Sequence, residues 1–150
     1  KALGEFRPAD QRQSVVNIGG ITVLDDSYNA NPLSMEMAFR SAKQIAGNHY
    51  FLVLGDMGEL GRFEEKLHYE TGVKAGKIGF DGLITVGPLS RFLAKGAEEA
   101  GMKTVMTCDT CEEAAEKLMK MAAPGDVVLV KGSHYMHMER IPAVLRGEKA

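Results

Sequence analysis

The densest group of chemically useful side chains in this sequence is the stretch DDSYNANP, which runs from Asp25 to Pro32. It follows an apolar run that ends at Leu24 and supplies carboxylates, a hydroxyl, a phenol and amides. Open α/β sheets bind ligands at the carboxyl ends of their strands, where loops and helix N-termini converge. Such side chains suit a ribose, a metal-bound phosphate or an amino-acid substrate. Asn31 and Pro32 are also typical of a capped helix start. The prediction of a binding site therefore depends on the polar residues that precede them.

Two further polar segments follow apolar runs. One reads GDMGELG and begins at Gly55; the other is Lys131-Gly132-Ser133. The glycine spacing matches neither a dinucleotide fingerprint nor a phosphate loop. Asp56 and Glu59 favour a substrate ammonium group or Mg²⁺ as a neighbour, while a solvated glycine turn explains the segment equally well. Right-handed crossovers place the ends of parallel strands on one side of a sheet, so the three segments can share a site.

The elements that must position these segments alternate along the chain. Two β-rich runs flank Gly19-Gly20 and predict a hairpin. Helices are expected at residues 33–46, 64–75, 89–100 and 111–122, and strands at residues 49–54, 82–86, 104–107 and 127–130. The first helix is expected to bury Met37, and Glu113 to complete a capping box with Thr110. The predicted fold is three-layer α/β and Rossmann-like, with a mostly parallel sheet of about six strands and one antiparallel strand from the N-terminal hairpin.

Composition narrows the classes of function. The chain has 150 residues, 45% hydrophobic and 25% charged, with a net charge of -2. These values indicate one globular domain, with no electrostatic basis for nucleic-acid binding and no apolar run for membrane insertion. The absence of an initiating Met at Lys1 suggests a piece of a longer protein. Cys108 and Cys111 form a lone C-x-x-C, which is compatible with a redox dithiol or half a zinc site but more consistent with two thiols in a reducing cytoplasm.

Three motifs in order identify a family resemblance: DDSYNANP followed by Ser34-Met35, LGDMGELG, and VLVKGS. They resemble the C-terminal domain of Mur ligases, from about Arg12 to the final helix. Within that family the first loop is most similar to the branch that adds D-alanyl-D-alanine to UDP-N-acetylmuramoyl-tripeptide. The resemblance implies a cytoplasmic, ATP- and Mg²⁺-dependent ligase of peptidoglycan precursor synthesis. In that chemistry ATP phosphorylates a carboxylate, and an amino group attacks the acyl phosphate.

The resemblance also implies a domain organisation and roles for individual residues. Residues 1–12 would be a linker from a central domain that binds most of the ATP and Mg²⁺, and residues 13–150 the C-terminal domain, inactive without the N-terminal and central domains. No catalytic or metal-binding residue is expected in this chain. The implied nucleotide contacts are Arg12, Asp26, Tyr28, Asn29 and Asn31, and the implied amino-substrate contacts are Asp56, Glu59, Lys131 and Ser133. Gln11 replaces a family glycine, and His134 replaces an arginine, which weakens any anion contact there.

Two other functions remain open on the sequence. One is a stand-alone small-molecule binding module with a Rossmann-like fold. The other is an independent acid–base enzyme built on Asp26, Asp56, Glu59 and His68, although a single helix histidine is more often a packing or surface residue. Lys131 has an alternative role as well, because it could pair with a nearby acid instead of a substrate.

Overall fold

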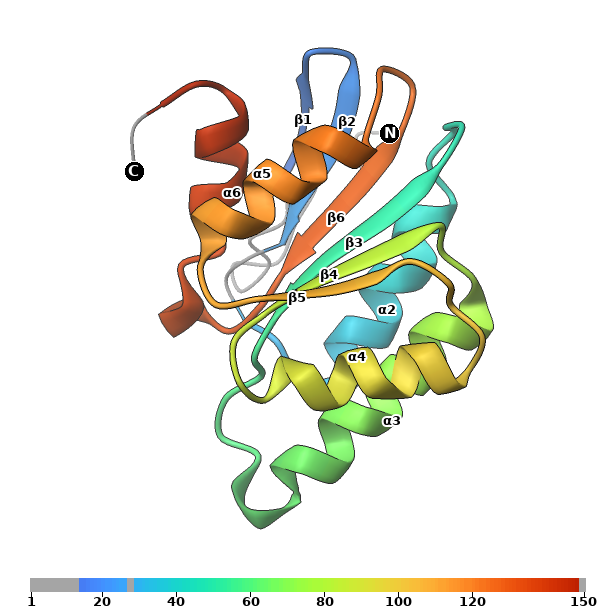
Figure 1. The fold of residues 1–150 in the computed structure, drawn as a ribbon, viewed down its shortest axis with the longest axis vertical. Helices are drawn as coiled ribbons and strands as arrows, with labels where there is room; N and C mark the ends of the chain where they lie inside the picture. The colour runs from blue at the N-terminus through green and yellow to red at the C-terminus, as the bar shows by residue number, and fades with distance from the viewer. Residues whose placement is uncertain (1–13, 27–28, 149–150) are drawn as a thin grey trace, which may run out of the picture.

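A six-stranded sheet runs through the molecule in the computed structural model, which describes residues 14–26 and 29–148 (Figure 1). Its strands are β1 (Ser14–Ile18), β2 (Ile21–Asp26), β3 (Tyr50–Gly55), β4 (Gly82–Val86), β5 (Val105–Cys108) and β6 (Val127–Lys131). Their order is β1-β2-β6-β3-β4-β5, with β1 antiparallel to β2 and all other pairs parallel. The predicted fold class, including the antiparallel hairpin strand, is confirmed. The turn between β1 and β2 uses positive φ angles at Gly19 (61°) and Gly20 (89°), as a primed hairpin turn requires.

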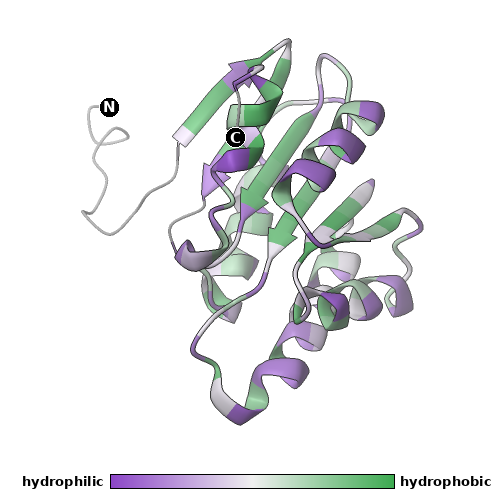
Figure 2. Cartoon of the chain, turned by 60° about the vertical axis from the view of Figure 1, so that its left-hand side comes forward, coloured by the Kyte–Doolittle hydropathy of each residue, from purple (hydrophilic) through white to green (hydrophobic). Residues whose placement is uncertain are grey.

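Helices cover both faces of this sheet. They are α2 (Pro32–Lys43), α3 (Glu64–Ile78), α4 (Ser90–Glu99), α5 (Cys111–Met121) and α6 (Arg140–Leu145), with 3-10 turns at Gly61–Phe63 and His134–Met136. One core joins α2, α3 and α4 to Leu52 and Leu54 of β3, and a second joins α5 and α6 to Phe51 and Val53. Successive β3 side chains therefore enter opposite cores, and Figure 2 shows hydrophobic strands between helices with hydrophilic outer faces. Within the described residues, no helix has the length and apolar character needed to cross a membrane.

Two local predictions were wrong in detail. In α2 the buried side chains include Met35, Ala38 and Phe39, whereas Met37 is 61% exposed. The sheet-facing stripe follows the i, i+3, i+4 spacing from Met35; of the predicted face, Ala38 and Ala42 are buried, whereas Met37 and Ser41 are exposed. At α5, Thr110 does accept a hydrogen bond from the Glu113 amide (3.1 Å), but the Glu113 carboxylate accepts from the Asp109 amide (3.0 Å) instead of closing a box with Thr110.

Helices α3 and α4 touch along their backbones. A Cβ atom on Gly72 would lie 1.9 Å from the Leu93 carbonyl oxygen, and one on Gly96 would lie 2.1 Å from the Tyr69 carbonyl oxygen. No side chain fits at either position without moving a helix. This contact fixes α4 firmly against α3, and the N-terminus of α4 reaches the edge of the sheet where the polar loops lie.

Candidate functional site

The three polar segments do converge at one edge of the sheet. Strands β2, β6 and β3 are adjacent and parallel, and the register aligns Asp26 with Lys131 and Lys131 with Leu54. We call the edge formed by the ends of these three strands the strand-end edge; it lies where the arrows of β2 and β6 terminate in Figure 1. The predicted convergence of the loops is confirmed.

A buried ion pair organises the loop after β2. The Lys131 Nζ donates to Asp26 Oδ2 (2.9 Å) and to the Asn29 carbonyl oxygen (2.8 Å). The Lys131 side chain is 2% exposed and that of Asp26 16%. Among the described residues, no hydrogen bond reaches Asp26 Oδ1. Lys131 thus pairs with an acid, as its alternative role required, and holds the Oδ2 atom of Asp26.

The remaining predicted nucleotide contacts fall into two groups. Asn31 caps α2: its Oδ1 accepts from the Ser34 amide (2.8 Å), and Ser34 Oγ accepts from the Asn31 amide (3.0 Å). Asn29 is exposed, with its carbonyl oxygen bound by Lys131. Arg12 and Tyr28 lie outside the described residues.

Asp56 is directed at the N-terminus of α4 and not toward open solvent. Its Oδ1 accepts from the Ser90 amide and the Ser90 hydroxyl, each at 2.7 Å, and its Oδ2 accepts from the Leu89 amide at 3.3 Å. The residue is 3% exposed. A carboxylate in this position satisfies helix amides that have no intrahelical partner and is stabilised by the helix dipole. Asp56 therefore anchors the loop, and both of its carboxylate oxygens are bound within the fold.

His68 is a second anchor of the same loop. The side chain is completely buried; Nε2 accepts from the Met57 amide (2.9 Å), and Nδ1 contacts the Glu64 carbonyl oxygen (2.6 Å). Because a carbonyl oxygen only accepts, the ring proton lies on Nδ1. With both nitrogens occupied and no solvent access, His68 has no free position for proton exchange with a substrate. His68 therefore cannot serve as the base of an independent acid–base enzyme.

Ser133 links the loop after β6 to the loop after β3. Its Oγ accepts from the Gly58 amide (2.6 Å), and its own amide donates to the Asp56 carbonyl oxygen (3.0 Å). Since the hydroxyl acts as an acceptor toward Gly58, its proton remains to be donated elsewhere. Ser133 is 6% exposed, and its Oγ is held by the Gly58 amide.

Glu59 of the loop after β3 is an exposed side chain, and so are His134 and Tyr135 of the loop after β6. Glu59 is exposed and holds a left-handed backbone, with φ of 60°. Tyr135 is 56% exposed, and a Cβ atom on Gly58 would lie 2.8 Å from its Cε2. Burial, followed by the negative charges of Asp56 and Glu64, raises the pKa of Tyr135. Sequence reasoning missed Tyr135, because its place in the site depends on this contact with a loop far away in the chain.

The cysteines do not form a reactive centre. Cys108 ends β5, Cys111 begins α5, and both are free and buried. Burial, followed by the charge of Glu112, raises the pKa of Cys111 to about 11, which leaves almost no nucleophilic thiolate at neutral pH. Cys111 Sγ lies 3.6 Å from the Met136 carbonyl oxygen and 3.7 Å from that of His137. Within residues 14–26 and 29–148, no group of three His, Cys, Asp or Glu side chains could hold a metal ion.

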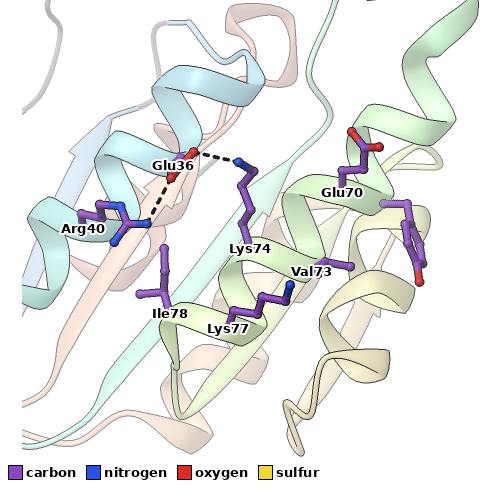
Figure 3. Close-up of a pocket in the computed structure, with 8 residues that line it drawn as sticks. Glu36, Arg40, Glu70, Val73, Lys74, Lys77 and Ile78 are labelled. Carbon is purple, nitrogen blue, oxygen red and sulfur yellow. Dashed lines mark hydrogen bonds and ion pairs between the residues drawn. The ribbon is translucent and has the colours of Figure 1, made fainter.

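A groove on the helical layer is separate from this edge (Figure 3). Its lining comes from α2 and α3: Glu36, Arg40, Tyr69, Glu70, Val73, Lys74, Lys77 and Ile78. Glu36 accepts from both Lys74 and Arg40, each at 3.1 Å, and these two cations lower the pKa of its carboxyl group. None of the predicted site residues lines the groove.

The sequence of this chain is similar to those of known proteins. Residues 11–134 match the family described as Mur ligase, glutamate ligase domain. The UDP-N-acetylmuramoyl-tripeptide--D-alanyl-D-alanine ligase of Bacillus subtilis (strain 168) is 35% identical over 144 residues, covering 94% of this chain and 32% of that relative. The protein of the same name from Treponema pallidum (strain Nichols) is 32% identical over 150 residues, covering 99% of this chain and 32% of that relative.

Solved structures agree with these relatives. The crystal structure of MurF ligase from Thermotoga maritima in complex with ADP has a TM-score of 0.81 at 26% identity, covering 97% of this chain and 33% of that one. MurF from Acinetobacter baumannii has a TM-score of 0.82 at 29% identity, covering 97% of this chain and 32% of that one. The chain therefore spans about a third of the length of these proteins. Because the family model matches well over half of it, the chain belongs to the Mur ligase, glutamate ligase domain family.

Proposed function

We propose that this chain is the C-terminal domain of a longer ATP-dependent ligase that joins D-alanyl-D-alanine to UDP-N-acetylmuramoyl-tripeptide in peptidoglycan precursor synthesis. The names of the curated relatives support the reaction, and the ADP in the Thermotoga maritima structure supports a nucleotide. The observation that carries the proposal is the convergence of Asp26, Lys131 and Ser133 at the strand-end edge. One side of that edge presents a carboxylate oxygen, and the other presents a hydroxyl donor.

The proposed reaction has two steps. ATP transfers its γ-phosphate to the tripeptide carboxylate, which gives an acyl phosphate and ADP. The amino group of the dipeptide then attacks the acyl carbon, loses a proton and expels phosphate as the amide bond forms. This chain has no Gly-Lys-Thr/Ser phosphate loop, so cradling of the phosphates and most Mg²⁺ binding are assigned to other domains of the ligase. The isolated chain should supply one wall of the active site and the dipeptide contacts without catalysing either step.

On the nucleotide side, we assign the ribose hydroxyls to Asp26. Lys131 holds Oδ2 in place, which leaves Oδ1 to accept a hydrogen bond from the diol, as carboxylates do in dinucleotide folds. Arg12, Tyr28 and Asn29 remain proposed contacts of the same nucleotide. Asn31 serves that site through the cap that fixes the start of α2.

On the amino-substrate side, we assign the dipeptide carboxylate to the Ser133 hydroxyl. Its lone pair is engaged by the Gly58 amide, so the proton can point to a bound carboxylate. The Lys131 ammonium is engaged by Asp26 and the Asn29 carbonyl oxygen, so the assignment rests on Ser133. Glu59 is the exposed carboxylate of the facing loop and is assigned to the substrate ammonium group, while Asp56 holds that loop in place through α4.

The reading frame that contains this chain tests the whole proposal. It should encode a Gly-Lys-Thr/Ser nucleotide loop upstream, and the purified full-length protein should form the amide with consumption of ATP. The 150-residue chain alone should show neither ATP hydrolysis nor ligation. A full-length protein without dipeptide-dependent ADP release would leave the stand-alone binding module as the better explanation.

Steady-state kinetics of the full-length protein test the residue assignments. Asp26→Asn should raise the KM for ATP more than that for the dipeptide; because it also leaves the buried Lys131 without its carboxylate partner, its unfolding free energy is measured alongside. Ser133→Ala should raise the KM for D-alanyl-D-alanine roughly ten- to a hundredfold, the effect of about 1.5–3 kcal/mol for a lost hydrogen bond to a charged group. Glu116→Gln, at an exposed position on α5, is the matched control and should change neither constant. Equal effects of Ser133→Ala on both substrates would remove Ser133 from the dipeptide site.

A further inference from the structure

Tyr135 occupies a distinctive position at the strand-end edge. It belongs to the 3-10 turn His134–Met136 that follows Ser133, and 56% of its surface is exposed. On its inner side, the ring lies against the backbone of Gly58, where an added Cβ would approach Cε2 to 2.8 Å and Cδ2 to 3.6 Å. The ring therefore rests on the loop after β3 and turns its remaining surface outward.

The backbone around Tyr135 is fixed on both sides although the ring is exposed. The Met136 amide donates to the Ser133 carbonyl oxygen (2.8 Å), and the His137 amide donates to that of His134 (3.1 Å). Cys111 Sγ lies beneath the carbonyl groups of Met136 and His137. A turn held in this way needs no reordering when a ligand packs against the ring, which favours binding.

The ring and the Ser133 hydroxyl share one small surface. The same Cβ position on Gly58 that lies 2.8 Å from the Tyr135 ring lies 3.5 Å from Ser133 Oγ. Burial, followed by the charges of Asp56 and Glu64, raises the pKa of the phenol, and the contact with Gly58 puts the ring beside the loop that carries Glu59. An apolar ring next to a hydroxyl donor suits a ligand with a small apolar group beside a carboxylate. A single exposed aromatic residue is ordinary on a protein surface; this one lies beside a hydroxyl whose lone pair is already engaged by a backbone amide.

We propose that Tyr135 is a specificity-determining residue whose ring packs against the alanyl methyl groups of the amino substrate while Ser133 binds the carboxylate. This inference rests on the proposed ligase function and adds a residue to its amino-substrate site. The phenol oxygen has no part in the contact, since the ring supplies the apolar surface. The ring should favour a dipeptide with methyl side chains over one without them.

Three variants of the full-length ligase test the proposal. Tyr135→Ala should raise the KM for D-alanyl-D-alanine roughly tenfold, as expected for truncation of an aromatic contact, and leave the KM for ATP unchanged. Tyr135→Phe should behave like the unmodified enzyme. Met119→Ala removes another exposed apolar side chain, 57% exposed on α5, and should have no effect. The preference for D-alanyl-D-alanine over glycylglycine should fall in Tyr135→Ala only.

Each result supports or overturns the assignment. An unchanged dipeptide KM in Tyr135→Ala overturns it, and so does an equal rise in the KM for ATP, which would indicate a displaced loop. Tyr135→Phe with the defect of Tyr135→Ala would transfer the role to the phenol oxygen and overturn the packing proposal. Failure of the ligase function itself is seen separately, because the unmodified enzyme would then not use D-alanyl-D-alanine at all.

Discussion

The two loops that face each other across the strand-end edge are held by different means. The loop after β2 depends on one buried cation, Lys131, which binds both Asp26 and the Asn29 carbonyl group. The loop after β3 is held by several contacts, each satisfying a separate backbone amide: His68 binds that of Met57, and Ser133 binds that of Gly58. Among the described residues, one side chain and the Asn31 cap hold the first loop, whereas contacts from several segments hold the second.

This difference determines what a substitution does. Removing one member of a buried ion pair leaves an uncompensated charge, and the cost exceeds that of most hydrogen bonds. Removing one acceptor of a backbone amide leaves a single unsatisfied donor while its neighbours stay bound. Under the proposed assignments, function should follow the same division: the loop after β2 should be sensitive to charge and the loop after β3 to geometry.

The largest expected effect is that of Lys131→Met. It strands the Asp26 carboxylate at a site where the side chain is 16% exposed, and should lower the free energy of unfolding by about 3 kcal/mol. Urea denaturation of the 150-residue chain measures this. Lys95→Met, at an exposed position of α4, is the control and should be nearly neutral.

A double variant tests whether the ion pair is the source of the lost stability. In Lys131→Met/Asp26→Asn both charges are gone, so part of the lost stability should return. A double variant that is less stable than Lys131→Met alone would show that the pair is not the source of the effect.

An intermediate effect is expected for His68→Leu. The substitution keeps a buried apolar side chain but removes the acceptor of the Met57 amide, at a cost of about 1–3 kcal/mol. Hydrogen exchange should locate the damage, with faster exchange at Met57 and unchanged exchange in β2. His68→Gln retains an acceptor and should be milder. If β2 exchanges as fast as Met57 in His68→Leu, the two loops are not independently held.

The smallest effect concerns Cys111, which supports the turn of Tyr135. The folded thiol has a pKa of about 11, above the ordinary value of 9.0, so the unfolded chain loses this proton first as the pH rises. Below about pH 9 both states keep the proton, and the contribution is constant; between about 9 and 11 stability falls with pH. The difference in unfolding free energy between the unmodified chain and Cys111→Ala, measured from pH 8 to 10.5, should change in that direction. A difference that does not vary with pH would place the thiol in contact with water.

The sequence predicted the parts of this fold that depend on neighbours along the chain. The hairpin, the buried strands and the Asn31 cap all follow from short-range patterns, and the convergence of loops follows from the handedness of parallel crossovers. The roles of Asp56 and His68 do not, because each is defined by a partner in another segment. Asp56 meets Ser90 across 34 positions, and Ser133 meets Gly58 across 75. Acidic and hydroxyl side chains look equally suited to a ligand or to an unsatisfied amide until these partners are known.

The crossing of α3 and α4 limits how this domain can change over evolutionary time. Gly72 and Gly96 each press directly on a carbonyl oxygen of the opposite helix, so even alanine at either place would push the two helices apart. No compensating change elsewhere can help, because the obstruction is main chain and not a side chain that could be shortened. Both positions are therefore expected to be as intolerant of replacement as residues that touch substrate, although neither does. In a mutational survey of this domain they would imitate a functional site, and only the helix geometry would reveal the difference.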